Sequence, residues 1–254
     1  MKPQINKQIE LYLNWCKFVA DMTEQTISSK SYILWRFVAQ TNIKNSFEIT
    51  NELFNHWKNG MLSGSLTGLK HRPNTCNVRI RTVRAFVKWL KSCGVPVPIQ
   101  TPFMQLVRQN EDCSYIFYTR EQIQKVLSMA NSTQKAMISL MFESGLRLTE
   151  FQNIKIDDIN FQESSITVIG KGRKYGKAFF TAEAKHFLLD YLFENQVSSG
   201  FLWQSVRNNY LPYTRDALRA KMREPFEKAG FYNFTPHQLR HSFATDLIEN
   251  GATI

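Results

Sequence analysis

The sequence lacks the features of a membrane-spanning or disulfide-stabilised protein. Its 254 residues include no apolar run long enough to cross a bilayer. The first seven residues lack the basic start, apolar stretch and cleavage site of a signal peptide. The four cysteines, Cys16, Cys76, Cys93 and Cys113, are widely spaced and form no Cys-x-x-Cys pair, so neither a disulfide framework nor a zinc site is indicated. We therefore expect a cytoplasmic globular protein with reduced thiols and no membrane partner.

Positive charge, by contrast, is abundant and unevenly distributed. The net charge is +11; residues 1–110 hold 15 Lys and Arg against 5 Asp and Glu, whereas residues 111–254 hold 17 against 16. A basic domain of this kind suits a nucleic-acid backbone or an anionic membrane surface, although a basic soluble protein without either partner has the same composition. The first part of the chain is therefore the part expected to face a polyanion.

Hydrophobic spacing predicts four helices in this basic part, at about 4–21, 27–42, 47–62 and 73–93. In the fourth helix, Val83, Phe86, Val87 and Leu90 fall on one face. Basic residues fall on another face and gather at the helix entry, which favours phosphate contact over an ordinary solvated surface. The candidate DNA-binding residues here are Lys70, Arg72, Arg79, Arg81, Arg84, Lys88 and Lys91.

A proline-rich stretch marks the domain boundary. Pro96, Pro98 and Pro102 fall within seven residues, remove backbone donors and favour extended backbone. Thr119 with Gln122 then forms a capping-box start for a helix at 119–130. We predict a first domain at 1–96, a linker at 97–117 and a second domain at 118–254.

The second domain is predicted to be mostly helical with a small antiparallel β-sheet, which makes the fold mainly α. Its patterns indicate further helices at about 132–144, 147–154, 182–195, 213–229 and 236–250, and strands near 164–169 and 175–180. The glycines and charges of residues 170–177 suit the tip of a hairpin between the two strands.

Two short motifs in this domain could meet an anion. Arg147 follows Gly145 at a predicted helix junction, where its guanidinium can project from the fold. Lys171 stands between two glycines at the hairpin tip, beside Arg173 and Lys174, which are further candidate DNA-binding residues. Taken singly, each has an ordinary alternative, a solvated arginine or a basic turn. The Gly-Lys-Gly lacks the spacing and the strand-loop-helix setting of a nucleotide-binding loop, which excludes an NTPase.

A third motif begins the last predicted helix. Thr235 is a plausible N-cap and Pro236 suits the first helical position. His237 and Arg240 are three residues apart and share a face, so imidazole, guanidinium and helix end could together hold a phosphate. His241 is expected to point away from that face. A structural role for a lone His-x-x-Arg is the alternative.

Together, the three motifs are specific. Gly-Leu-Arg-x-x-Glu, then Gly-Lys-Gly between two strands, then Thr-Pro-His-x-Leu-Arg-His-x-Phe-Ala-Thr resembles the catalytic signature of the tyrosine recombinases of the phage integrase family. The resemblance covers nearly the whole chain. It implies a four-helix core-binding (SAM-like) domain followed by an α-rich catalytic domain with a small antiparallel sheet. The compact size and separate basic domain favour a recombinase over a type IB topoisomerase, which shares the chemistry.

The resemblance also implies a role for each site residue. Arg147 and Arg240 would clamp the scissile phosphate, His237 would act as acid or base, and Lys171 would protonate the leaving 5′-oxygen. Glu150 would support the site from behind. Double-stranded DNA is the implied partner, and no cofactor or metal is implied, since fixed cations replace a metal ion and a covalent phosphotyrosine conserves the bond energy. The absence of an acidic cluster of the two-metal type agrees.

The sequence departs from the family pattern after Arg240. The family places its tyrosine nucleophile beyond this helix, and none of the 14 residues that follow Arg240 is a tyrosine. We therefore expect this chain to be truncated before the nucleophile and to bind DNA without cleaving it, as a monomer or weak dimer. The full-length protein would form a tetramer on paired sites, in a prokaryotic or phage-encoded, nucleoid-associated setting. A natural non-catalytic protein that occupies recombination sites is the alternative, and a membrane-surface or partner-binding helical module is a more distant one.

Overall fold

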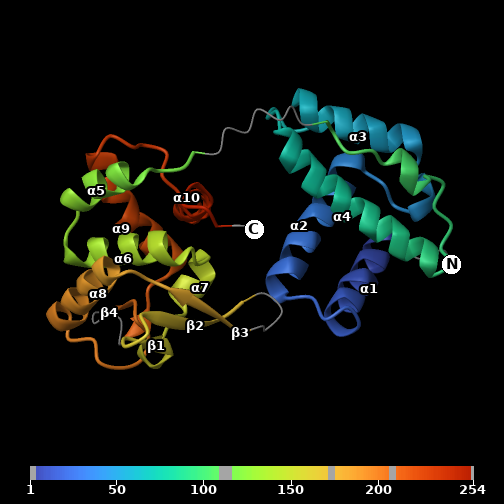
Figure 1. Ribbon diagram of the computed structural model, residues 1–254. Helices are drawn as coiled ribbons and strands as arrows, with labels where there is room; N and C mark the ends of the chain where they lie inside the picture. Colours follow the sequence, from blue (N-terminus) through green and yellow to red (C-terminus); the bar gives the residue numbers. More distant parts are fainter. Residues whose placement is uncertain (1–3, 109–115, 171–174, 206–209, 253–254) are drawn as a thin grey trace. The chain divides into compact units, whose positions relative to one another are not determined.

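The computed structural model describes residues 4–108, 116–170, 175–205 and 210–252 (Figure 1). The chain divides into two compact units, Met1–Cys113 and Ser114–Ile254. The fold is mostly helical with small antiparallel sheets, which confirms the predicted fold class. No helix within the described ranges is long and apolar enough to span a membrane.

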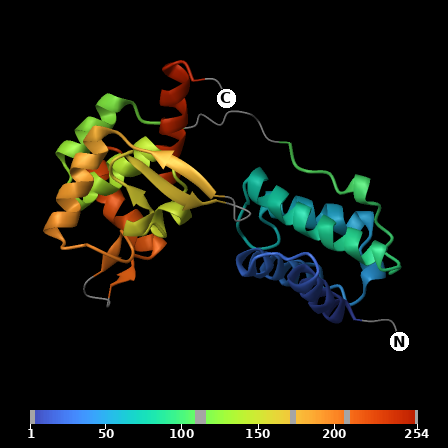
Figure 2. The same cartoon turned by 60° about the horizontal axis from the view of Figure 1, so that its bottom comes forward.

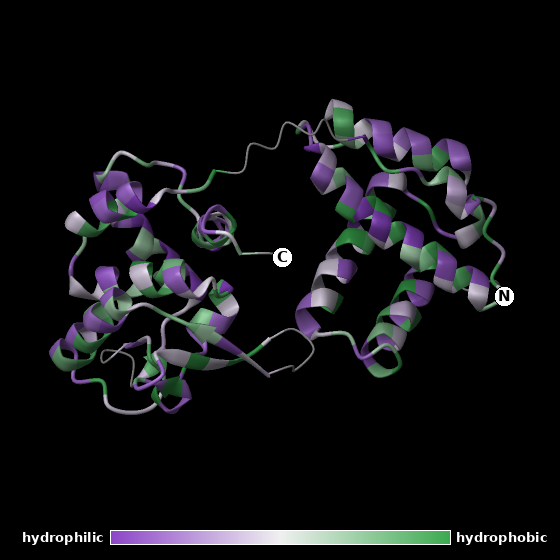
Figure 3. Ribbon diagram, viewed as in Figure 1, coloured by the Kyte–Doolittle hydropathy of each residue, from purple (hydrophilic) through white to green (hydrophobic). Residues whose placement is uncertain are grey.

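The first unit is built from four α-helices, as predicted. They are α1 (Ile5–Phe18), α2 (Glu24–Thr41), α3 (Asn51–Ser63) and α4 (Pro73–Ser92), with 3₁₀ helices η1 (Ser46–Glu48) and η2 (Thr101–Phe103). Their apolar faces meet in a core that includes Tyr12, Phe37, Trp57 and Phe86, all nearly inaccessible to solvent. The side of α3 seen in Figure 3 is largely hydrophilic, consistent with an amphipathic helix on a small core.

The segment predicted as a linker is partly structural. Val97, Ile99 and Met104 are buried in the first core. The side chain of Asn77 donates to the carbonyl of Val107 (3.0 Å) and accepts from its N–H (2.7 Å). The prediction of a linker beginning at residue 97 was therefore wrong for its first half. The prolines correctly predicted extended backbone. The apolar residues between them, Val97 and Ile99, are buried in the same core as the apolar face of α4.

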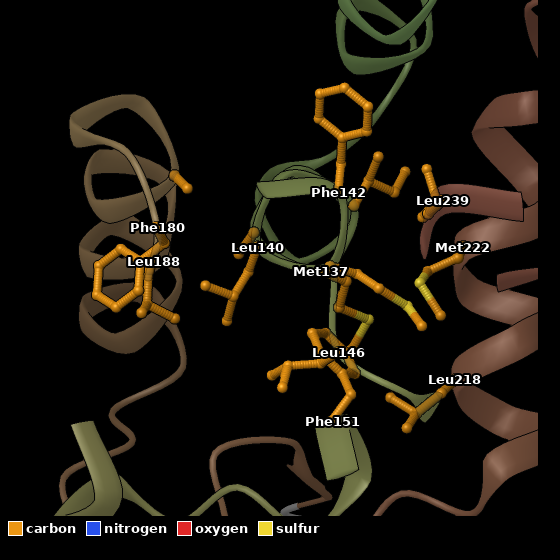
Figure 4. Close-up of a cluster of buried hydrophobic side chains, with 14 of the residues drawn as sticks. Met137, Leu140, Phe142, Leu146, Phe151, Phe180, Leu188, Leu218, Met222 and Leu239 are labelled. Carbon is orange, nitrogen blue, oxygen red and sulfur yellow. The ribbon is translucent and has the colours of Figure 1, made fainter. Parts of the chain in front are cut away.

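The second unit is organised around α6 (Ser132–Ser144), which packs against α8 (Ala182–Glu194), α9 (Arg215–Lys228) and α10 (Pro236–Glu249). Figure 4 shows Leu140 of α6 facing Leu188 on one side, while Met137 faces Met222 on the other. The shorter helices α5 (Arg120–Ser128) and α7 (Leu148–Gln152) lie before and after α6 in the chain. The predicted capping box of Thr119 and Gln122 starts α5.

A small sheet in the second unit carries the hairpin. It has the order β1-β2-β3, all antiparallel, with β1 (Ile159–Asn160) after the 3₁₀ helix η3 (Ile156–Asp158), then β2 (Ser165–Ile169) and β3 (Tyr175–Phe179). Ile169 pairs with Tyr175, so β2 and β3 form a hairpin that projects beyond the helices of its unit (Figure 2). A second pair, β4 (Gln204–Ser205) and β5 (Leu211–Pro212), was not predicted because two-residue strands show no alternation.

Candidate active site

The site begins at the turn that ends α6. Gly145 caps this helix in the left-handed conformation, with φ 58° and ψ 21°. A Cβ placed on Gly145 would overlap the ring of Phe243, which belongs to α10. Glycine is therefore required twice here, by its backbone conformation and by the approach of another helix. This approach brings α10 against the α6–α7 junction.

Arg147 lies two residues further on, at the N-cap of α7. Its backbone N–H donates to Oε2 of Glu150 (2.8 Å), and its Nη1 donates to Oε1 of the same carboxylate (2.7 Å). The side chain of Glu150 is only 9% exposed, whereas that of Arg147 is 50% exposed. Glu150 therefore pairs with the arginine from a nearly buried position, while half of the Arg147 side chain stays exposed. The supporting role of Glu150 stays a prediction.

Arg240 approaches the same junction from α10. Its Nη1 donates to the carbonyl oxygen of Gly145 (2.6 Å). The start of α10 is fixed by the side chain of Gln238, whose Oε1 accepts from the N–H of Thr235 (2.6 Å). The single bond to Gly145 anchors the guanidinium while its other N–H groups make no hydrogen bond with the described residues. These groups are available to an anion.

His237 lies within the electrostatic field of both arginines. Its pKa is lowered from the ordinary value, first by burial and then by the positive charges of His241, Arg240 and Arg147. The rings of His237 and His241 lie 4.9 Å apart, edge to face. The expectation that His241 points away was wrong, because residues four apart on a helix share a face.

The structure thus brings together three of the predicted site residues, Arg147, His237 and Arg240, from two separated segments. Two guanidinium groups provide fixed planar donors, and an imidazole with a lowered pKa stays neutral near pH 7. Such an arrangement can bind a tetrahedral oxyanion and stabilise charge that develops on it. Lys171, Arg173 and Lys174 lie outside the described residues.

A pocket of about 810 Å³ extends from Arg147 toward the hairpin of β2 and β3. Arg147, Glu150, Thr167 and Tyr175 are among the residues that line it. Tyr175 is not among the predicted site residues, although its position in a strand beside the Gly-Lys-Gly places it at the hairpin end. The strands that flank Lys171 therefore line the same hollow as Arg147.

In the first unit, the predicted DNA-binding residues divide into two groups. Arg79 is half-buried, and its Nη1 lies 3.0 Å from Nε2 of His71. Arg84 is also half-buried, and its Nε is inaccessible to solvent. The residues on the surface are Lys70, Arg72, Arg81, Lys88 and Lys91. Of these five, Lys91 donates from Nζ to the carbonyl oxygen of Ile99 (2.5 Å), whereas the side chains of the other four make no hydrogen bond or ion pair with the described residues and can reach an extended polyanion without rearrangement.

Comparison with protein families matches residues 117–254 to the phage integrase family. The tyrosine recombinase XerC of Lactobacillus leichmannii is 30% identical over 202 residues, which cover 74% of this chain and 68% of that protein. XerC of Staphylococcus aureus is 26% identical over 261 residues, covering 96% and 84%. The matched segment holds the α6–α7 junction, the hairpin and α10. The chain belongs to the phage integrase family.

Among solved structures, the chain is similar to the Tn1549 transposon integrase in complex with transposon right end DNA. The TM-score is 0.76 at 16% sequence identity, and the match covers 97% of this chain and 88% of the other. At this identity the likeness concerns the fold, which is that of the integrases.

Gly145→Ala should destabilise the second unit by more than its backbone strain alone. We expect the free energy of unfolding to fall by about 3 kcal/mol, since a left-handed alanine costs about 1–2 kcal/mol and overpacking against Phe243 adds to it. Gly230→Ala is the matched control, because Gly230 has φ 94° but nothing within 4 Å of the added Cβ. Equal losses in urea unfolding of the two variants would show that the approach of Phe243 is unimportant.

His237 should titrate below the ordinary histidine pKa of about 6.5. Because the pKa of His237 is lowered in the folded state, the unfolded chain binds the proton more tightly. The stability that neutral His237 contributes is therefore fully present above the ordinary histidine pKa. It is lost as the pH falls from that ordinary pKa toward the lower pKa of the folded state. NMR titration of the His237 ring in the wild type and in Arg147→Gln tests this. We expect a higher pKa in the variant; an unshifted pKa in both proteins would contradict the described convergence.

Proposed function

We propose that this chain supplies the DNA-binding surface and the phosphate-activating groups of a site-specific DNA recombinase, which cleaves and rejoins DNA through a 3′-phosphotyrosine intermediate. The observation that carries the proposal is the convergence of Arg147, His237 and Arg240 at one junction. Membership of the phage integrase family supports it. DNA in the complex of the Tn1549 integrase supports duplex DNA as the partner.

The proposed chemistry is a metal-independent transesterification. A tyrosine hydroxyl gives up its proton to a base and its oxygen forms a bond to the scissile phosphorus, while the bond from phosphorus to the 5′-oxygen breaks and the leaving oxygen takes a proton. Arg147 and Arg240 neutralise the charge on the non-bridging oxygens, and Lys171 is the proposed proton donor. His237 assists proton transfer, which its neutral state near pH 7 suits.

The tyrosine nucleophile is assigned to no residue of this sequence. All nine tyrosines precede Arg240, whereas the family resemblance puts the nucleophile after it. We propose that these 254 residues bind duplex DNA, as a monomer or weak dimer, without forming a covalent adduct. Exchange of strands would require a tetramer on paired sites in the prokaryotic compartment that holds the DNA.

The test uses the 254-residue chain and a nicked duplex from its native locus, in the presence of EDTA. We expect salt-sensitive binding and no covalent protein–DNA species on a denaturing gel. If the reading frame continues past the Ile254 codon and encodes a tyrosine, expressing those residues as well should add a 3′-phosphotyrosyl adduct. Failure to bind duplex DNA would refute the proposal, and an adduct formed by the 254-residue chain would refute its non-cleaving part.

Removing exposed charges of α4 should weaken this binding uniformly across DNA sequences. Arg81 and Lys88 are exposed and make no hydrogen bond or ion pair with the described residues. Arg81→Ala and Lys88→Ala should each lower the slope of log affinity against log salt by about 1. Lys17→Ala is the control, since Lys17 is exposed in the same unit but paired with Glu24 at 2.7 Å. An equal effect of all three, measured by fluorescence anisotropy, would assign binding to net charge alone.

A further inference from the structure

The helix that carries His237 and Arg240 is held along another side by a short segment from the start of the second unit. Gln238, Ser242 and Asp246 lie four residues apart, so they form a polar stripe along α10. The backbone N–H of Tyr118 donates to Oγ of Ser242 (2.7 Å). The phenolic hydroxyl of Tyr118 donates to Oε1 of Gln238 (3.4 Å). Segment 118–120 therefore contacts α10 at successive turns.

Arg120 makes the last and strongest of these contacts. Its Nε and Nη2 donate to the two carboxylate oxygens of Asp246, at 2.8 and 2.6 Å, which is the bidentate geometry of a charge-assisted pair. Its Nη1 donates to Oε1 of Glu143 at 3.2 Å. Glu143 belongs to the last turn of α6, two residues before Gly145. One guanidinium therefore joins α10 to α6.

Both carboxylates are removed from most of the solvent. The side chains of Glu143 and Asp246 are 10% and 18% exposed, respectively. Burial raises the pKa of Glu143, and the charge of Arg120 opposes that rise. The Arg120 side chain itself is 51% exposed, so the two pairs are shielded from solvent screening on the carboxylate side only.

This arrangement determines the direction of α10. The bond from Arg240 to the Gly145 carbonyl fixes one point of the helix, and the Arg120–Asp246 pair fixes a second point six residues later, about 9 Å along the axis. These two points act together with the bonds from Tyr118 to Ser242 and Gln238 and with the buried side chain of Leu239. Loss of the second point would free the later turns of the helix to tilt, which would shift His237 and Arg240 against Arg147.

We propose that Arg120 is a positioning residue of the site: by joining Asp246 of α10 to Glu143 of α6, it sets the register of His237 and Arg240 against Arg147. The inference rests on the proposed function, in which these three residues bind a phosphate. Arg120 itself does not touch the phosphate. Its planar fork holds both oxygens of Asp246 and one oxygen of Glu143 at once, a geometry that the compact ammonium group of a lysine cannot reproduce.

The experiment measures the His237 pKa by NMR in the 254-residue chain, and then the affinity for inorganic phosphate from the phosphate-dependent shift of the same ring. In Arg120→Ala we expect the His237 pKa to rise toward its ordinary value and phosphate to bind at least about threefold more weakly, because misplaced groups lose oriented contacts. Arg120→Lys should recover part of both. Arg219→Ala is the control, since Arg219 pairs with Asp216 at 2.9 Å on α9.

A second variant separates positioning from stability. Arg120→Ala leaves Asp246 and Glu143 without their partner and should lower Tm, whereas Arg120→Ala/Asp246→Ala removes one of the two unpaired carboxylates and should recover part of the Tm. We expect the double variant to keep the altered His237 pKa and the weakened phosphate binding. Wild-type values of both in the folded double variant would overturn the proposal and leave Arg120 a purely structural role.

The same measurements distinguish this failure from a failure of the proposed function. If Arg147→Gln and Arg240→Gln also leave the His237 pKa and phosphate binding unchanged, the three residues do not form a phosphate site. If those two variants lose binding while the Arg120 variants do not, the site stands and only the positioning role is wrong.

Discussion

The approach of α10 to the end of α6 is the constraint on which the site depends. Gly145 makes it possible, because any side chain there would occupy the place of the Phe243 ring. The carbonyl of the same glycine then accepts the hydrogen bond from Arg240. One residue without a side chain thus permits the contact and also anchors a cation in it. Arg147 follows directly, so the same turn determines the position of both guanidinium groups.

Local sequence patterns were sufficient to predict most of the helices and to select Arg147, His237 and Arg240, which the structure brings together. The roles of these residues stay predictions. The capping box at Thr119 and the proline at the start of α10 are signals written in a few adjacent residues, and the structure has a helix at each. Periodicity could not show that Val97 and Ile99 are buried, because burial depends on a partner surface. The predicted direction of His241 was wrong for a different reason. His241 is adjacent to Arg240 in sequence, but it is four residues from His237, and this spacing puts the two histidines on one face of the helix.

The contacts that hold the site together could not have been predicted in the same way. Arg120 and Asp246 are 126 residues apart, and neither stands in a pattern that marks it as a partner of the other. The spacing of Gln238, Ser242 and Asp246 does mark one side of α10 as polar and regular. Without the fold, however, that stripe is indistinguishable from an exposed helix surface. Long-range pairing is a property of the topology, which short motifs do not encode.

The second unit has a small excess of positive charge, 17 Lys and Arg against 14 Asp and Glu, and its charges are separated in space. Three of its carboxylates lie beside or behind the cations of the site. Glu150 pairs with Arg147 from a nearly buried position, and Glu143 and Asp246 are joined through Arg120. Acidic groups thus stand behind or beside the cations, and the donors that remain face outward. Because these donors are fixed before an anion arrives, little reorganisation is needed when charge develops on it. A unit with a small net charge can therefore present guanidinium groups that its carboxylates do not cover, whereas the first unit carries the larger excess of positive charge.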